Sequence, residues 1–165
     1  MRELSAARTN LVRVPYTTAD ARQQLLDTIA EAVEKLGAAL SSLSEAYERL
    51  DENTADTVEE ALFRPTQTAY GRARRAHAGF ATRHGLPQRT FEAAVAGAPA
   101  RGARGFIDSA VSSIADADRL LATLQDSMLP VEVGDVELRA ELEQVRSLLG
   151  GLGLRARELE RTLGR

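Results

Sequence analysis

The sequence contains no cysteine and no tryptophan, and only two histidines among its 165 residues. Without cysteine, the chain forms no disulfide, offers no thiolate to a metal and has no cysteine nucleophile. Its longest stretch without a charged residue is 36–44, far shorter than the roughly 20 residues of a membrane-spanning helix. The charged first residues do not resemble a secretory signal. We therefore expect no membrane span and a cytoplasmic location.

The chain is rich in alanine and leucine, both of which favour helix. Hydrophobic residues make up 44% and charged residues 27% of the sequence, a balance typical of a folded domain in water. The length of 165 residues fits a single domain. The composition therefore predicts one all-α domain.

Apolar residues between positions 18 and 50 recur in alternating steps of three and four, the pattern of a heptad seam. Thr17 and Asp20 suit the start of this helix. At 1.5 Å per residue it is expected to be roughly 50 Å long, which suits a bundle. The seam consists of Leu26, Ile29, Val33, Leu36, Leu40, Leu43, Tyr47 and Leu50.

The second helix is predicted to begin at Asn53 or Thr54 and to end at Gly85, with Pro87 just beyond. Pro65 is expected to kink its first part, because proline cannot donate a backbone hydrogen bond. One stripe of this helix is predicted to face the core, namely Phe63, Thr66, Tyr70, Ala73, His77, Phe80 and His84.

The third helical segment, residues 88–128, contains the sequence AGAPARGARG at positions 96–105, which predicts an interruption. Before it we expect a short helix at Phe91–Val95. After it, helical periodicity resumes at Ile107 and stops at Pro130.

The last helix is predicted to start after Gly134 with Asp135 as its cap. Gly150, Gly151 and Gly153 lie in its middle, each costing up to about 1 kcal/mol relative to alanine. Close approach of a neighbouring helix or a tolerated kink is the favoured explanation, and a hinge or ligand groove is the alternative. The seam of this helix is Leu138, Leu142, Val145, Leu149, Leu152, Ala156, Leu159 and Leu163.

Together these segments predict an elongated, up-down antiparallel four-helix bundle formed by residues 17–165, with the third helix interrupted near residues 96–105. We expect short connections of about two to six residues, which make successive helices antiparallel. Residues 1–16 are expected to form an N-terminal arm.

Few residues are available for catalysis. His77 and His84 lie seven residues apart on one helix, which separates them by about 10 Å along its axis, too far for both to bind one ion. We therefore expect a non-catalytic protein with no metal and no cofactor. A phosphorelay role at His77 is the remaining catalytic hypothesis. The phosphorylated histidine of a histidine phosphotransfer domain is typically followed by a lysine, which is missing here. We therefore expect His77 in the core or at its rim.

Charge is unevenly distributed. Residues 64–104 contain eight arginines and one acidic residue, whereas residues 51–63 contain five acidic residues and no basic one. Arg64, Arg72, Arg75 and Arg83 fall within an arc of about 100° on the second helix, opposite its apolar stripe. An outward charged face explains this stripe without a ligand. The functional hypothesis is an anion-binding surface for an acidic partner, a phosphorylated ligand or a nucleic-acid backbone.

The sequence therefore favours a non-catalytic helical-bundle protein that binds another protein or associates with itself. The seams of the first and last helices are the expected contact surfaces. The alternative is an accessory protein that binds an anion or a nucleic-acid backbone through the arginine stripe. The acidic pI of about 5.5 argues against a dedicated nucleic-acid binder.

Overall fold

The structure, a computed structural model, describes residues 18–96 and 102–163, and all regular secondary structure in these ranges is helical. The prediction of an all-α protein is confirmed for this part of the chain. The proposed arm at residues 1–16, as well as Thr17, lies outside the described residues. The helices are α1 (Thr18–Tyr47), α2 (Glu52–Val58), η1 (Glu59–Phe63), α3 (Arg64–Arg83), α4 (Gly102–Asp126), α5 (Leu129–Val133) and α6 (Val136–Leu163).

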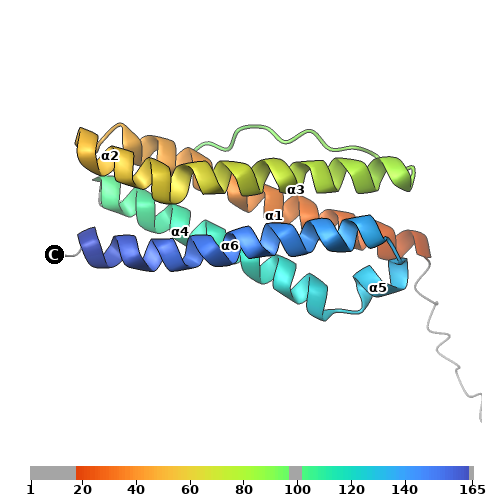
Figure 1. The fold of residues 1–165 in the computed structure, drawn as a ribbon. Coiled ribbons are helices and arrows are strands. Elements are labelled where there is room, and N and C mark those ends of the chain that lie inside the picture. The colour runs from red at the N-terminus through yellow and green to blue at the C-terminus, as the bar shows by residue number, and fades with distance from the viewer. Residues whose placement is uncertain (1–17, 97–101, 164–165) are drawn as a thin grey trace, which may run out of the picture.

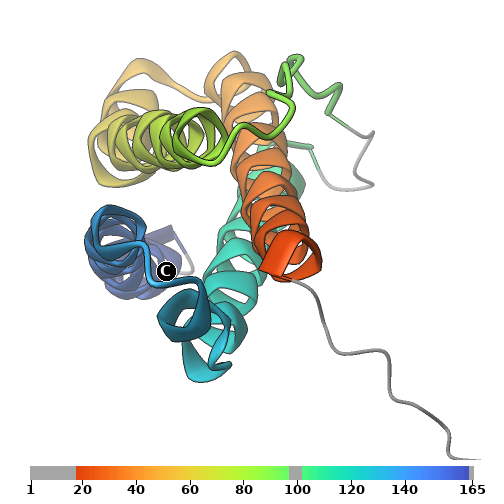
Figure 2. The same ribbon diagram turned by 90° about the vertical axis from the view of Figure 1, so that its right-hand side faces the viewer.

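Four long helices surround one core (Figures 1 and 2). Helix α1 packs against α3 and α4, and α6 packs against the same two helices on the other side. Neighbours are antiparallel. The end of α3 meets the start of α6, where Arg83 pairs with Asp135, and the turn after α1 meets the start of α4, where Arg49 lies over the ring of Phe106.

The predicted seams of α1 and α6 are used inside this bundle. The α6 seam is buried from Leu138 to Leu159, and most of the α1 seam is buried with it. Burial of such apolar stripes supplies most of the stability of a helical bundle. The expectation that the seams form additional contact surfaces was therefore wrong, because the four helices bury them against one another.

The order of the helices differs from the predicted up-down arrangement. Between α3 and α4 the described residues 84–96 contain no helix and run back along the outside of the bundle (Figure 1). Helix α4 therefore begins near the end where α3 begins, and the two run in the same direction (Figure 1). The prediction of short connections fails here, and with it the strict alternation of direction. Bundles with one long crossover connection are a known variant of the architecture.

Residues 86–96, which we call the strap, contain no helix, so the predicted short helix at Phe91–Val95 was wrong. The strap is held by contacts to the helices beneath it. Leu86 N–H donates to Ala81 O, and Ser41 of α1 donates to the carbonyl of Ala94, which a helix would have used internally. The extended path of the strap is thus held by hydrogen bonds to α1 and α3, which outweigh the helix propensity of its alanines.

The second predicted helix is found as a continuous run of α2, η1 and α3. Asp51, rather than Asn53 or Thr54, caps it by accepting a hydrogen bond from the Thr54 amide at 3.0 Å. The predicted disturbance at Pro65 takes the form of the π-helical turn η1. There the Arg64 amide bonds to Glu59 O, one residue further back than in an α-helix. A wider turn removes the clash that the proline ring would otherwise make with the preceding turn.

Candidate functional site

The contact between the end of α3 and the start of α6 is organised by Asp135. Its carboxylate, 6% exposed, accepts two hydrogen bonds of 3.0 Å from the Arg83 guanidinium. It also lies 2.8 Å from His84 Nε2 and accepts the Leu138 amide at 2.8 Å, which makes it the predicted N-cap of α6. One carboxylate therefore both starts α6 and fastens it to α3.

The electrostatics of this cluster favour the charged form of Asp135. Burial alone raises the pKa of Asp135, but hydrogen bonds from Arg83, the Leu138 amide and His84 outweigh it and lower the pKa to about 2. The hydrogen bond to Asp135 raises the pKa of Arg83 in turn, and Glu137 also contacts that guanidinium at 3.2 Å. Arg83 is thus matched by two carboxylates and has little positive charge to offer a ligand.

The other three arginines of the predicted stripe lie in different surroundings. Arg72 donates to the side-chain oxygen of Gln144 on α6 at 2.6 Å, and Arg64 pairs with Glu59 at 3.3 Å within its own helical run. Arg75 forms no hydrogen bond or ion pair with any residue in 18–96 or 102–163, although its charge acts on Glu141 of α6. The pKa of Glu141 is raised because its burial outweighs the effects of Arg83 and Arg75. The stripe therefore faces α6 over much of its length.

His77 is buried, with 2% of its surface exposed, and the Phe91 ring of the strap packs edge-on against it with the ring centres 5.1 Å apart. Burial lowers the pKa of His77, and the positive charge of Arg89 lowers it further. The prediction that His77 lies in the core or at its rim is confirmed.

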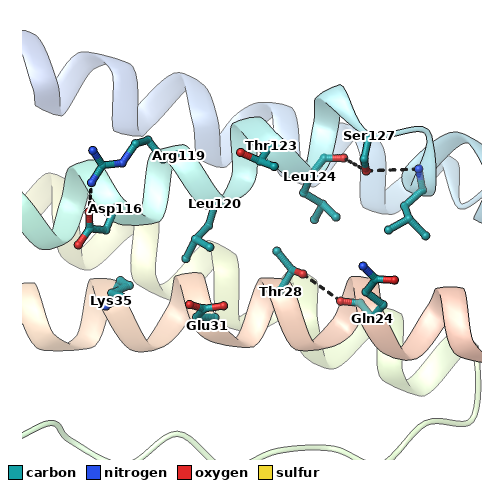
Figure 3. A pocket seen from close by; sticks show the side chains of 11 residues that line it. Gln24, Thr28, Glu31, Lys35, Asp116, Arg119, Leu120, Thr123, Leu124 and Ser127 are labelled. Carbon is teal, nitrogen blue, oxygen red and sulfur yellow. Dashed lines mark hydrogen bonds and ion pairs between the residues drawn. The ribbon is translucent and has the colours of Figure 1, made fainter.

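A groove of about 460 Å³ runs between α1 and α4 (Figure 3). Leu120 and Leu124 point from α4 toward α1, and Thr28 of α1 lies opposite them (Figure 3). One end carries uncharged polar residues, whereas the other carries the ion-paired Asp116 and Arg119. The groove is thus apolar at its floor and polar along its rim.

Apolar side chains are exposed next to the end of this groove, in a region that we call the α5 corner. Met128, Val131 and Val136, with exposed fractions of 61%, 52% and 68%, flank or belong to the short helix α5. Leu129 lines the groove itself. Sequence reasoning missed this corner. The available signal was the density of apolar residues in a short connection between two helices, where polar residues are usual.

No family model, no curated protein and no solved structure matches this chain. The described residues contain no group of three or more potential metal ligands. Within the same ranges, no helix is both long and apolar enough to cross a membrane.

Proposed function

We propose that this protein is a non-catalytic helical-bundle protein that binds an amphipathic helix of another protein. The observation that carries the proposal is the α1–α4 groove with the α5 corner at its end. Most of the seams of the long helices is buried inside the bundle, whereas the groove and the α5 corner keep apolar surface available to a partner. The cytoplasmic location expected from the sequence is part of the proposal.

The shape of the groove supports a helical occupant. It lies between two long antiparallel helices, and its residues span positions 24–35 on α1 and 116–124 on α4, with Ser127 and Leu129 just beyond the end of α4. A helix laid along such a groove places apolar side chains on the floor at intervals of three and four residues. Its polar face then remains in water, beside the threonines and charged residues of the rim.

Charge on the rim favours a partner helix with little net charge at this contact. Glu31 and Lys35 of α1 face the end of the groove that holds Asp116 and Arg119 of α4, so opposite charges alternate there. An excess of either charge on the partner would place like charges together. Apolar contact at Leu120 and Leu129, rather than charge, is expected to supply most of the affinity.

The proposal is tested by quantitative affinity capture from the native cell, followed by binding measurements with the purified partner. Thr123→Arg combined with Met128→Asp blocks the groove and charges the α5 corner through two exposed positions. Leu154→Asp is the matched control, because Leu154 is an exposed apolar residue of α6 outside the groove. A partner retained by wild type and control but lost by the double variant supports the proposal.

Two results would overturn it. In the first, no protein is captured in a manner that depends on the groove, and sedimentation shows a monomer at every concentration. In the second, sedimentation shows a dimer that the double variant abolishes, in which case a second copy of this chain is the occupant rather than another protein.

A further inference from the structure

A second groove, of about 360 Å³, lies between α3 and the strap. It shares no residue with the α1–α4 groove, so its role is independent of the proposed function. Its walls carry three arginines, two from α3 and one from the strap, and no carboxylate. The lining is Gly71, Arg74, Arg75, His77, Ala78, Gln88, Arg89, Thr90 and Phe91.

Arg75 of this groove has no carboxylate among the lining residues, although its charge also acts on Glu141 of α6. It forms no hydrogen bond or ion pair in the described part of the chain, and one of its terminal nitrogens lies 3.5 Å from the position a Cβ would take on Gly71. The guanidinium therefore folds down along the helix over a residue without a side chain. An exposed arginine without a carboxylate partner keeps its five donors available for an anion.

The other two guanidinium groups are held in place by aromatic rings. Arg74 lies over the ring of Tyr70 at 5.4 Å, and Arg89 lies over the ring of Phe91 at 5.8 Å. Arg89 also contacts Glu34 of α1, which engages one of its terminal nitrogens. Side chains that are already ordered lose less entropy when a ligand binds.

Neutral groups complete the groove. Gln88 is positioned by its hydrogen bond to Thr82 at 2.7 Å, and Thr90 brings a hydroxyl to the wall. The ring of Phe91 adds an apolar surface. The groove thus combines three guanidinium groups, a hydroxyl group and one aromatic ring.

We propose that the groove between α3 and the strap binds the phosphate group of a small phosphorylated molecule, held by Arg74, Arg75 and Arg89. Planar guanidinium groups match the geometry of phosphate oxygens and donate charge-assisted hydrogen bonds to them. The volume falls within the range of small-molecule sites, about 300–1,000 Å³, and exceeds the needs of a bare phosphate ion. The remaining space beside Phe91 fits an apolar or aromatic moiety.

The proposal is tested by titrating the full-length protein at low salt with phenyl phosphate and, separately, with inorganic phosphate, and by recording two-dimensional NMR spectra. We expect saturable shifts at Arg75, Arg89 and Thr90 with both probes, and tighter binding of phenyl phosphate because its ring contacts Phe91. Binding also raises the pKa of His77, since a bound anion offsets the positive charge of Arg89.

Variants assign the binding to the groove. Combining Arg74→Gln with Arg75→Gln is expected to weaken binding at least about tenfold through the loss of charge-assisted hydrogen bonds. Arg64→Gln is the matched control on the same helical run outside the groove, with an expected change of less than about twofold. Both arginines of the double variant are exposed, so the fold is expected to be retained.

Three outcomes overturn the proposal. The first is the absence of saturable shifts up to about 10 mM of either probe, which is weaker than a specific small-molecule site. The second is equal weakening by the Arg64→Gln control. The third is binding of a single-stranded oligonucleotide but of neither small probe, which would instead support the extended stripe of arginines as a polyanion surface.

Discussion

The two flanks of α3 carry the same kind of residue in different surroundings. On the flank toward α6, Arg83 meets Asp135 and Glu137, and Arg72 meets Gln144. On the flank toward the strap, Arg74 and Arg75 form no ion pair within the described residues, although the charge of Arg75 also acts on Glu141 of α6. An arginine of α3 is therefore structural or available to a ligand according to which residues of the neighbouring element lie opposite it. Position on its own helix does not decide between the two roles.

Removal of Asp135 is expected to give the largest effect on this comparison. Asp135→Ala deletes the cap of α6 and leaves Arg83 and His84 without their buried partner. We expect a loss of about 3 kcal/mol in the free energy of unfolding, measured by urea denaturation. Glu137→Gln is the control, since its exposed pair with the same arginine is worth less than about 1 kcal/mol. We call the buried contacts of the Asp135 carboxylate with Arg83, His84 and the Leu138 amide the clamp; equal losses in the two variants would contradict it.

The pH dependence of the free energy of unfolding of the wild-type protein tests the same flank, with a smaller expected effect. The pKa of Asp135 is lowered from 3.8 to about 2, so the folded state holds the carboxylate charged where the unfolded chain would protonate it. The contribution of this group is present above the unfolded pKa and is lost as the pH falls from about 5 through 2. It amounts to about 2 kcal/mol. Urea denaturation across this range should show the loss, and Asp135→Asn should remove it; an unchanged profile would be inconsistent with the clamp.

The smallest expected effect compares two glycines of α3, each four residues before an arginine. A Cβ at Gly71 would lie 3.5 Å from a nitrogen of Arg75, an ordinary contact, whereas a Cβ at Gly79 would lie 3.0 Å from a nitrogen of Arg83. Gly71→Ala is therefore expected to raise the free energy of unfolding by about 0.5–1 kcal/mol through helix propensity. Gly79→Ala should gain less or lose stability, because Arg83 must shift away from Asp135. Equal gains by thermal denaturation would show that the clamp tolerates displacement.

How much of the fold could be predicted from the sequence depends on how many helical turns share one periodic pattern. The α6 seam and its cap at Asp135 were predictable because an unbroken pattern along a helix of 28 residues agrees with a capping residue at its start. The strap was not, because the segment from Phe91 to Val95 contains too few turns to distinguish a helix from an extended segment. Its path depends on Ser41 and Glu34, far away in the sequence.

The same limit applies to the candidate sites. The periodicity of α3 gives the angular position of each arginine but not the helix that lies opposite, so it could not separate Arg83 from Arg75. It also could not place Arg89 of the strap beside them. The central glycines of α6 were interpreted as a close helix approach or a tolerated kink, with a hinge or ligand groove as the alternative. A Cβ at Gly150 or Gly151 would meet no atom beyond its chain neighbours and its own helix backbone within 4 Å, which contradicts the close approach. The structure offers no packing reason for these two residues.

The most direct test of the division along α3 is an NMR titration of the arginine side-chain N–H signals with phenyl phosphate at low salt. The Arg83 Nε–H is expected to be well protected from solvent exchange and unmoved, since both carboxylate oxygens of Asp135 hold its guanidinium. The Arg75 and Arg89 signals are expected to shift together and to saturate. Movement of Arg83 to the same extent as Arg75, or the absence of any shift, would contradict the account.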